Sequence, residues 1–514
     1  MKPYYITTPI YYVNAAPHIG HAYTTLAADI LNRFRVMRGE KTRLLTGTDE
    51  HGSKIEEVAK ARGVTPKAHA DEISEEFRQL WKDLEVRFDD FIRTTEPRHE
   101  ETVQAVFKAL HEKGDIYKGS YRGFYCVSCE TYWTLGELGD KRVCQNPDCG
   151  KPLREVEEES YFFKLSRFQE PLLEHYKAHP EFLQPHARAP EILRWVEGGL
   201  KDISVSRTKV AWGVQVPFDP QHTVYVWFDA LLNYVSALGY RPGQPPSKEF
   251  SEYWPADAHL VGKEIFRFHA VIWPAMLMPL GLPLPRMVFA HGWWTVEGEK
   301  MSKSKGNFID PRDLIKDYRL DAFRYVLFRE MPFGADGNFS RKAFHERYNA
   351  DLANNLGNLV ARTCEMVDKF LAGQLPSKPP AEPPAKTREA IAASQGIYDA
   401  MERLAFYDAL TRIWQIISGL NLYIDQEKPW KTISTDPERV KLVLFDVVWS
   451  LRLVAGWLAP FMPETSAKMQ SQLGVRQFPA PLTAEEVLAG GPSGARIQKA
   501  PPLFPRKPPL PGGK

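Results

Sequence analysis

The chain has 514 residues, of which 43% are hydrophobic and 25% are charged, the composition of an ordinary globular protein. This length exceeds what one hydrophobic core supports, so we expect two to four domains. Lys and Arg (66) nearly balance Asp and Glu (64), so the net charge argues neither for nor against nucleic acid, and bulk charge is excluded as the means of binding it. Any RNA binding must use local patches.

No charged-then-apolar leader opens the sequence, and three prolines interrupt its longest apolar stretch, 270–284. We therefore expect neither a secretory signal nor a membrane span, and we expect a cytoplasmic protein. Five cysteines, four of them in one short region, fit a reducing compartment with a metal site better than disulfides.

Residues 1–114 alternate apolar, β-prone segments with amphipathic helical patterns. This alternation is typical of a parallel sheet with helices on its faces. The predicted strands lie at 4–6, 10–13 and 43–46, the last one ending at Gly47, and the predicted helices lie at 54–62, 66–84 and 99–113.

The sequence His18-Ile19-Gly20-His21 lies where the first strand gives way to a helical pattern from Ala22. Pro17 and Gly20 break the chain there, so both imidazoles should project from a strand-to-helix turn. Backbone N–H groups at a helix start, together with the two histidines, can hold phosphate charge. Taken in isolation, the same pattern also fits a solvated loop.

Residues 115–222 interrupt the alternation with shorter strands, turn signals and four cysteines spaced C-x2-C-x14-C-x4-C. Paired thiolates from tight turns can converge on one tetrahedral zinc ion, and four of them leave no position for water, so the site would be structural. The alternative is four buried or free thiols. The predicted ligands are Cys126, Cys129, Cys144 and Cys149, and Cys364, in a helical pattern, is expected to pack in a core.

The α/β pattern resumes at 224–227 and 258–261 and carries two apolar stripes. If a helix begins near Tyr225, four residues of the first stripe share one face, and three residues of the second recur at i, i+4 and i+8. Each stripe fits either core packing or the wall of a binding site. The stripes are Trp227, Ala230, Leu231 and Tyr234, and Ile265, His269 and Trp273.

A second polar cluster, Lys300-Met301-Ser302-Lys303-Ser304, follows a predicted turn at 297–299 and precedes Gly306 and Asn307. Two lysines on a glycine-bounded loop suit a mobile clamp on a developing pyrophosphate leaving group. The alternative is an exposed basic loop.

From Asp313 onward the pattern is almost wholly helical, and from Tyr348 its amphipathic helices suggest a bundle. Residues 375–385 read as a proline-rich extended loop. The Pro-, Lys- and Gly-rich tail, 499–514, is expected to be mobile because it lacks the residues to bury a core.

Polar residues of the bundle could contact RNA bases. Asn354, Asn358 and Arg362 share one helical face and offer amide and guanidinium donors. Trp430 follows a proline, and an exposed Trp there is a stacking platform for an unstacked base. A polar face of this kind can equally be solvated.

The two polar clusters, in this order, resemble the HIGH and KMSKS signatures of class I aminoacyl-tRNA synthetases. The likeness extends over most of the chain to the methionyl-tRNA synthetase family, whose amino-acid pocket falls at Trp-Phe-Asp-Ala (227–230) and Gly-Lys-Glu-Ile…His…Trp (262–273). It implies an α/β fold: a Rossmann-like doubly wound parallel sheet, split by a zinc-binding insertion and followed by an α-helical bundle that binds the anticodon. The implied domains are 1–114 (catalytic, first half), 115–222 (zinc insertion), 223–290 (catalytic, second half), 291–345 (stem-contact region with KMSKS), 346–490 (anticodon bundle) and 491–514 (tail).

The resemblance implies a ligase that forms methionyl-adenylate from L-methionine and ATP with magnesium. The enzyme would then transfer the methionyl group to tRNA(Met), both initiator and elongator, and would hold one structural zinc ion per chain. The family's knuckles usually have two residues within each cysteine pair, and the last pair here has four. The OB-fold module that often accompanies dimerisation in the family is not recognised in the sequence, so a monomer is expected.

Carried over position by position, the family's motifs put Asp49 on the substrate ammonium and Tyr12 and His269 near the sulfur. Two tryptophans form the apolar wall, and His51 orients its neighbours rather than reacting. The implied sets are: catalytic, His18, His21, Lys300 and Lys303; ATP-binding, the same four with Gly20 and Ser302; methionine-binding, Pro9, Ile10, Tyr12, Asp49, Trp227, Ala230, Leu231, Tyr234, Ile265, His269 and Trp273; anticodon-binding, Asn354, Asn358, Arg362 and Trp430.

Three alternatives stay open at this point. Class I synthetases for cysteine, leucine, valine or isoleucine share both signatures, although the last three usually carry a larger editing insertion and the cysteine enzyme places zinc in its amino-acid site. A small-molecule nucleotidyltransferase also uses HxGH but has no use for a helical C-terminal third. A non-catalytic RNA-binding relative is opposed by the two intact clusters.

Overall fold

The computed structural model describes residues 2–127, 131–133, 138, 142–145, 149–296, 298–300, 309–376, 382–474, 494–497 and 500–510. The chain forms two compact units, Met1–Pro17 with Lys41–His291 and His18–Glu40 with Gly292–Lys514. Among the described helices, none combines the length and the apolar character needed to cross a membrane.

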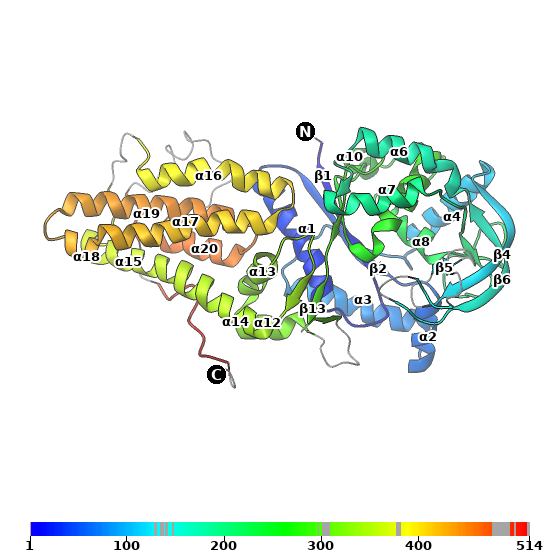
Figure 1. Cartoon of the computed structure of the whole chain (residues 1–514), viewed down its shortest axis with the longest axis horizontal. Helices are drawn as coiled ribbons and strands as arrows, with labels where there is room; N and C mark the ends of the chain where they lie inside the picture. The colour runs from blue at the N-terminus through cyan, green and yellow to red at the C-terminus, as the bar shows by residue number, and fades with distance from the viewer. Residues whose placement is uncertain are drawn as a thin grey trace. The chain divides into compact units, whose positions relative to one another are not determined.

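A six-stranded parallel sheet forms the centre of the first unit, in the order β3-β2-β1-β11-β12-β7 (Figure 1). The chain extends the sheet from β1 toward β2 on one side and toward β11 on the other, so the strand order reverses at β1. The parallel sheet predicted from the alternating pattern is confirmed. Its strands are β1 (Tyr4–Tyr12), β2 (Thr42–Asp49), β3 (Asp90–Arg93), β7 (Leu183–Gln184), β11 (Ala258–Gly262) and β12 (Val288–His291).

Strand β2 continues past Gly47 to Asp49, so the predicted end at Gly47 is wrong. A Cβ atom at position 47 would lie 2.0 Å from the carbonyl oxygen of Ile92 in β3. Glycine therefore allows a close backbone approach inside the sheet rather than ending the strand. The consequence is that Asp49 stands at the carboxyl end of β2.

The helices of the first unit each bury an apolar stripe against the sheet or its neighbours. The three N-terminal helices predicted from the sequence are confirmed to within two residues. In α3, Thr65 caps the first turn, and Phe77 and Trp81 pack on Tyr11 of β1 at ring-centroid distances of 5.4 Å. The helices are α2 (Ser53–Arg62), α3 (Pro66–Asp83), α4 (Pro97–Glu112), α6 (Gln169–Ala178), α7 (Ala189–Glu197), α8 (Val226–Leu231), α9 (Asn233–Ser236), α10 (Lys248–Tyr253) and α11 (Trp273–Leu277).

A four-stranded antiparallel sheet, in the order β5-β4-β6-β8, follows α4 in the chain. Its long pair β4 and β6 runs side by side in Figure 1, with Ile116 opposite Phe163 at one end and Tyr125 opposite Arg154 at the other. Cys126 ends β4, and Cys144 and Cys149 lie between β5 and β6, so a cysteine-bearing insertion follows the first strands of the parallel sheet as predicted. Its strands are β4 (Ile116–Cys126), β5 (Thr131–Trp133), β6 (Arg154–Phe163) and β8 (Ile203–Ser204).

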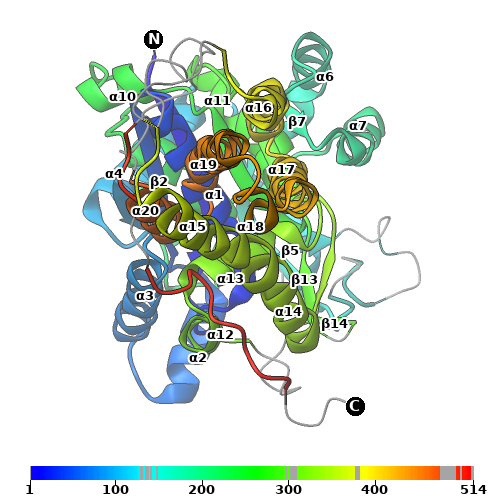
Figure 2. The same cartoon turned by 90° about the vertical axis from the view of Figure 1, so that its left-hand side faces the viewer.

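The second unit is mostly helical, and Figures 1 and 2 show its long helices α15, α16, α17 and α19 packed as a bundle. A small sheet in the order β14-β13-β15 lies in the same unit. The elements of the second unit are α1 (Ile19–Met37), β13 (Trp294–Val296), β14 (Glu299–Lys300), α12 (Pro311–Tyr318), α13 (Leu320–Arg329), β15 (Gly337–Phe339), α14 (Arg341–Arg347), a π-helix (Tyr348–Gly357), α15 (Asn358–Leu371), α16 (Ala385–Glu402), α17 (Phe406–Glu427), α18 (Pro429–Thr432), α19 (Pro437–Leu458) and α20 (Pro463–Gln472).

Residues 500–510 of the proline-rich tail pack within the second unit, so the expectation that the tail buries no core residue is wrong there. Phe504 is buried and packs edge-on against Tyr348. The Asn349 side chain replaces a strand partner, accepting from Lys507 N at 2.9 Å and donating to its carbonyl oxygen at 3.1 Å. A proline-rich segment can thus pack on the fold when neighbouring side chains form hydrogen bonds with its backbone N–H and C=O groups. Of the predicted loop 375–385, residues 377–381 lie outside the described part of the chain.

Candidate active site

The carboxyl ends of β1 and β2 bring together Asp49, predicted to bind the substrate's amino group, and Tyr12, predicted to lie near the sulfur. Tyr12 and Asp49 are register partners in the two parallel strands, and Val13 N donates to the Asp49 carbonyl oxygen at 3.2 Å. A register shift between Thr7 and Ile10 marks an irregularity in β1 just before this point. Ligands of open α/β sheets bind at such strand ends, beside the reversal of strand order.

The loop after Asp49 is held by buried polar contacts. Glu50 is fully buried and accepts two hydrogen bonds from Arg93 of β3, at 2.6 and 2.9 Å. The Trp212 indole donates to the Glu50 carbonyl oxygen at 2.5 Å, and the His51 ring lies edge-on to that indole. The loop is therefore a fixed support for the Asp49 carboxylate.

Tyr234 and His269 form the polar centre of an aromatic cluster. The Tyr234 hydroxyl lies 2.7 Å from His269 Nε2, and His269 Nδ1 lies 3.0 Å from the Ile265 carbonyl oxygen. The carbonyl can only accept, so Nδ1 carries the proton and the tyrosine donates to Nε2. Burial lowers the pKa of His269 to about 4, which leaves the imidazole neutral at pH 7. A neutral ring suits an uncharged thioether side chain.

Trp273 and His259 extend this cluster into the core. The Trp273 indole donates to His259 Nε2 at 3.2 Å, and His259 Nδ1 lies 2.6 Å from the Thr7 hydroxyl. The Tyr234 ring stands 4.2 Å from the His259 ring and 5.7 Å from the Trp273 ring, as measured between centroids. His259 was missed from the sequence; a lone histidine inside the apolar strand Ala258–Gly262 was the available signal.

Trp227 stacks on Phe268, with ring centroids 3.9 Å apart and planes 9° from parallel. Phe268 begins a π-helix, Phe268–Ile272, so the single α-helix that the i, i+4, i+8 stripe suggested is not formed there. The first stripe is also interrupted, because α8 ends at Leu231 and α9 begins at Asn233. Even so, Tyr234 meets both His269 and Trp273 of the second stripe, so the structure joins the two stripes.

The remaining members of the methionine set lie close by in the chain. Ala230 and Leu231 are buried in α8, Pro9 is buried in β1, and Ile10 and Ile265 are half-buried against the main apolar core. Taken together, the predicted set offers aromatic rings, the neutral His269 imidazole and the Asp49 carboxylate. Such a set of groups fits an apolar side chain carried by a cationic amino group.

In the second unit, His18 and His21 close the first turn of α1 as a capping box. Gly20 N donates to His18 Nδ1 at 3.0 Å, and His18 N donates to His21 Nδ1 at 3.1 Å. In the neutral tautomer each ring then carries its proton on Nε2. Desolvation, and secondarily the neighbouring His18, lower the pKa of His21 well below its ordinary value. A helix N-terminus carries a partial positive charge, so an arrangement of this kind can hold a phosphate.

Gly20 is constrained by the capping box, because a Cβ atom there would lie 2.9 Å from His18 Cε1. The two imidazole rings stack at 3.8 Å between centroids. Of the KMSKS cluster, Ser302 and Lys303 lie outside the described residues, as does the Lys300 side chain. Among the described residues that follow the cluster, Ile309 contacts the start of α1: its carbonyl oxygen accepts from Ile19 N at 3.3 Å.

Cys126, Cys144 and Cys149 converge with their sulfur atoms within 4.8 Å of one another. The Sγ atoms of Cys126 and Cys149 are 3.6 Å apart. Thiolates on a tetrahedral zinc ion lie about 3.8 Å apart, given Zn–S bonds of about 2.3 Å, so the cluster fits the metal. Cys149, the ligand of unusual spacing, is part of the group. Cys129 lies outside the described residues.

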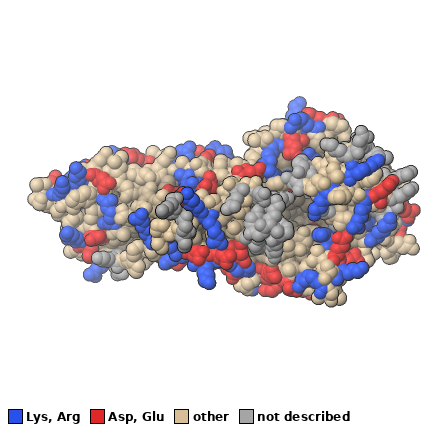
Figure 3. Space-filling model, turned by 60° about the horizontal axis from the view of Figure 1, so that its bottom comes forward, with Lys and Arg blue, Asp and Glu red and all other residues tan. Residues whose placement is uncertain are grey.

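Arg362 and Trp430 meet at one end of the bundle. The Arg362 guanidinium lies 5.7 Å from the Trp430 ring centroid and pairs with Asp425 at 2.8 Å, while Trp430 is 45% exposed. Asn354 and Asn358 are exposed too. On the face drawn in Figure 3, Lys and Arg side chains are interspersed with Asp and Glu. RNA contacts would therefore depend on such local groups.

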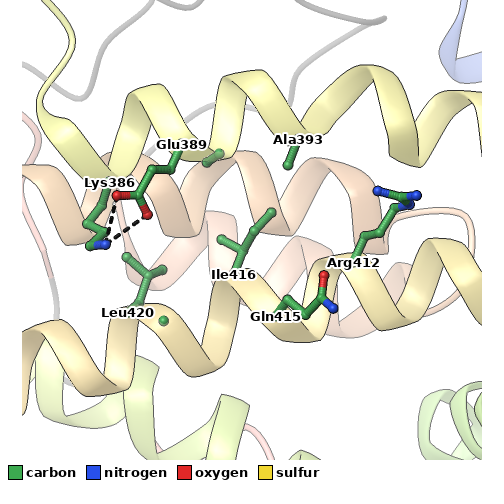
Figure 4. Close-up of a pocket in the computed structure, with 9 residues that line it drawn as sticks. Lys386, Glu389, Ala393, Arg412, Gln415, Ile416 and Leu420 are labelled. Atoms are coloured by element: carbon green, nitrogen blue, oxygen red, sulfur yellow. Dashed lines mark hydrogen bonds and ion pairs between the residues drawn. The ribbon is translucent and has the colours of Figure 1, made fainter.

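A pocket of about 220 Å³ lies between α16 and α17 (Figure 4). Lys386 at one end is paired with Glu389 at 2.8 Å, and Arg412 stands at the other end. None of its lining residues belongs to the predicted sites. The lining is Lys386, Glu389, Ala390, Ala393, Arg412, Gln415, Ile416, Gly419 and Leu420.

Family models match nearly the whole chain. The model described as tRNA synthetases class I (M) matches residues 4–151 and 137–364. The model of the anticodon binding domain of methionyl tRNA ligase matches residues 380–507, a range that includes Trp430 and the docked tail.

Curated relatives and solved structures agree with these models. A methionine–tRNA ligase of Caldanaerobacter subterraneus is 48% identical over 98% of this chain and 79% of its own length, and one of Halalkalibacterium halodurans is 47% identical over 98% and 78%. Mycobacterium tuberculosis methionyl-tRNA synthetase in complex with methionyl-adenylate superposes with a TM-score of 0.91 at 41% identity, covering 98% of this chain and 100% of that one. Its apo form gives a TM-score of 0.85 at 38% identity, covering 99% of each.

Proposed function

We propose a role for each of the residues above in the reaction of methionine–tRNA ligase. This chain belongs to that family of class I aminoacyl-tRNA synthetases. The enzyme activates L-methionine with ATP to methionyl-adenylate and transfers the methionyl group to tRNA(Met). Matches to both the catalytic and the anticodon parts decide against the other class I synthetases and against a small-molecule nucleotidyltransferase.

We assign the amino-acid site to the cluster at the strand ends of the first unit. The Asp49 carboxylate binds the substrate ammonium, because a cation removed from water needs an opposite charge close by. Tyr12 and His269 lie beside the sulfur, and Trp227 and Trp273 supply the apolar wall. The observation that supports this assignment is the register pairing of Tyr12 with Asp49 in adjacent strands. One of the two is the proposed ammonium partner, and the other is proposed to lie beside the sulfur.

We assign the phosphates of ATP to the capping box of α1. His18 and His21 donate through Nε2 while Nδ1 holds the turn, and the helix N-terminus adds its partial positive charge. Lys300 and Lys303 neutralise the pyrophosphate as it leaves, and ATP enters as its magnesium complex.

The first reaction needs no enzyme nucleophile or general base. A carboxylate oxygen of methionine, already ionised, attacks the α-phosphorus as the bond to pyrophosphate breaks. Catalysis is then positioning together with charge stabilisation. In the second step the acyl group passes to the terminal adenosine of the tRNA, and AMP leaves.

Two further assignments concern structure and RNA. Cys126, Cys144 and Cys149, with Cys129 as the fourth ligand, would hold one zinc ion that stabilises the insertion and has no part in the chemistry. Asn354, Asn358, Arg362 and Trp430 would read the CAU anticodon of initiator and elongator tRNA(Met). The exposed Trp430 ring, with the Arg362 guanidinium 5.7 Å from its centroid, would be the platform for a base. We also propose a cytoplasmic location and a monomeric state, and light scattering on the purified protein tests the monomeric state.

The test of the proposed function is ATP–pyrophosphate exchange with each of the twenty amino acids. Methionine alone should support strong exchange, and Asp49→Asn should raise the KM for methionine more than the KM for ATP. Strong exchange with leucine or cysteine would overturn the choice of substrate. An unchanged KM for methionine in Asp49→Asn would overturn the assignment of the ammonium site.

A further inference from the structure

We propose that Asp229 is a positioning residue for the amino-acid site, holding the loop that presents Asp49 to the substrate ammonium. The inference rests on the proposed role of Asp49. Asp229 acts through His51, which it binds directly from its position in α8.

The Asp229 carboxylate is fully buried and uses both oxygens on imidazoles. His51 Nδ1 lies 2.6 Å from Oδ2, and His99 Nε2 lies 2.7 Å from Oδ1. The other nitrogen of His99 is 2.8 Å from the Ser236 hydroxyl. Three segments far apart in the chain, the loop after β2, α4 and α8, therefore meet at one carboxylate. A buried carboxylate persists only with such partners.

The charges around the pair favour an ionic contact. Burial opposes the ionised form of Asp229, but His51 and His99 lower its pKa to about 2. Burial also opposes the charged form of His51, yet Asp229, Glu100 and Glu50 raise its pKa above the ordinary value. Glu100 of α4 faces the other ring nitrogen of His51 at 3.8 Å. The loop is thus held to α8 by opposite charges as well as by a hydrogen bond.

The contact reaches Asp49 because the residues between are fixed as well. Glu50 is clamped by Arg93, and Gly52 N donates to the Trp212 carbonyl oxygen at 3.1 Å. Asp49 is the last residue of β2, so its carboxylate leaves the sheet where this anchored loop begins. In α8 the neighbours of Asp229 include Ala230, and Trp227 lies two residues before it. One carboxylate therefore ties the ammonium partner's loop to the helix of the apolar wall.

An ion pair that only stabilises the fold would make the same contacts. The test must therefore separate an effect on methionine binding from an effect on the stability of the fold. Asp229→Asn keeps the shape and removes the charge. Asp115→Asn is the matched control, because Asp115 is also a buried acid, paired with Arg167 at 2.6 Å, and lies outside the amino-acid site. Methionine-dependent ATP–pyrophosphate exchange is measured on the full chain for both variants.

We expect Asp229→Asn to raise the KM for methionine by about 10- to 100-fold, the scale of a 1 Å misplacement, with the KM for ATP within about twofold of wild type. Asp115→Asn should leave both values near wild type. If Asp49→Asn is impaired but Asp229→Asn matches the control, this inference alone is overturned. If Asp49→Asn is itself unimpaired, the proposed ammonium site is overturned and the inference with it.

A double-mutant cycle gives a second readout. If Asp229 acts through Asp49, the Asp49→Asn, Asp229→Asn double variant should lose no more methionine affinity than Asp49→Asn alone. Additive losses would show independent roles and overturn the inference.

If Asp229→Asn folds poorly, variants of His51 test the same inference. An asparagine amide at position 51 can donate a hydrogen bond from the place of Nδ1. His51→Asn should therefore recover most of the methionine affinity that His51→Ala loses. Equal losses of methionine affinity in His51→Asn and His51→Ala would also overturn the inference.

Discussion

The Arg324 guanidinium donates to Asp29 Oδ2 at 2.6 Å, and both side chains are fully buried. Arg324 also donates to the carbonyl oxygens of Pro460 and Phe461, at 3.0 and 2.9 Å, while Asp29 accepts from Arg33 at 2.7 Å. The helix that begins with the His18–His21 capping box is thereby fixed to α13 and to the turn between α19 and α20. The turn of the capping box thus belongs to the same compact unit as the helical bundle.

This contact predicts a large loss of stability on removing one partner. Asp29→Ala leaves a buried guanidinium without its counter-charge, so we expect the free energy of unfolding to fall by about 3–5 kcal/mol, measured by urea denaturation. The control is Glu464→Gln, whose partner Lys468 is exposed and whose loss should cost under about 1 kcal/mol. Equal losses would mean that the buried pair contributes no more than a surface one.

The capping box predicts that two roles of His21 are separable. His21→Ala removes both the Nδ1 acceptor and the Nε2 donor and should slow adenylate formation by about 100- to 1000-fold, with methionine binding little changed. His21→Asn can still accept from His18 N, so α1 should keep its stability while the rate stays low. Pre-steady-state pyrophosphate release and thermal denaturation measure the two effects. A fast His21→Asn enzyme would limit His21 to capping.

The cysteine cluster predicts about one zinc ion per chain by elemental analysis. Cys126→Ser should lose the metal and lower thermal stability, because zinc binding contributes folding free energy directly. Cys364→Ser is the control, since that thiol is buried in α15 and lies in the other unit. Zinc content at the wild-type level in Cys126→Ser, or a metal-free folded wild type, would contradict the assignment.

Because the Trp430 ring is exposed, we expect its removal to affect tRNA charging but not methionine activation. Base stacking on an aromatic side chain contributes roughly 1–3 kcal/mol, so Trp430→Ala should reduce tRNA charging by about 5- to 150-fold. Methionine-dependent pyrophosphate exchange should stay near wild type. Leu422→Ala, in the same bundle and 58% exposed, provides a control without a stacking surface. A parallel fall in both assays would make Trp430 a structural residue.

Because His269 is buried, we expect the stability of the folded protein to fall in mild acid. Its pKa is about 4 in the folded protein and near its ordinary value of about 6.5 when unfolded. Between these values the unfolded chain binds the proton and the folded chain does not, so stability falls as pH drops from about 6.5 toward 4. Urea denaturation across this range should show a smaller fall in His269→Gln than in wild type. Identical pH profiles would mean that His269 titrates normally.

Features that depend on neighbours in the chain could be predicted from the sequence. The capping box closes within one turn, so the residues of His18-Ile19-Gly20-His21 contain all that it needs. The cysteine spacing likewise anticipates the convergence of Cys126, Cys144 and Cys149. The helices of 54–113 follow from apolar periodicity and punctuation by proline and glycine. In each case the interacting atoms come from a short stretch whose geometry is set by local backbone preference.

Contacts between distant segments could not be predicted in this way. Asp229 stood inside the Trp-Phe-Asp-Ala run, yet nothing in the run points to His51 or His99 as its partners. The stacking of Trp227 on Phe268 depends on a π-helix that periodicity does not reveal, and the docking of Phe504 depends on Tyr348 and Asn349. A buried charge or a proline-rich tail is stable only where packing brings complementary groups to it, and that meeting depends on strand order and helix placement across the whole fold.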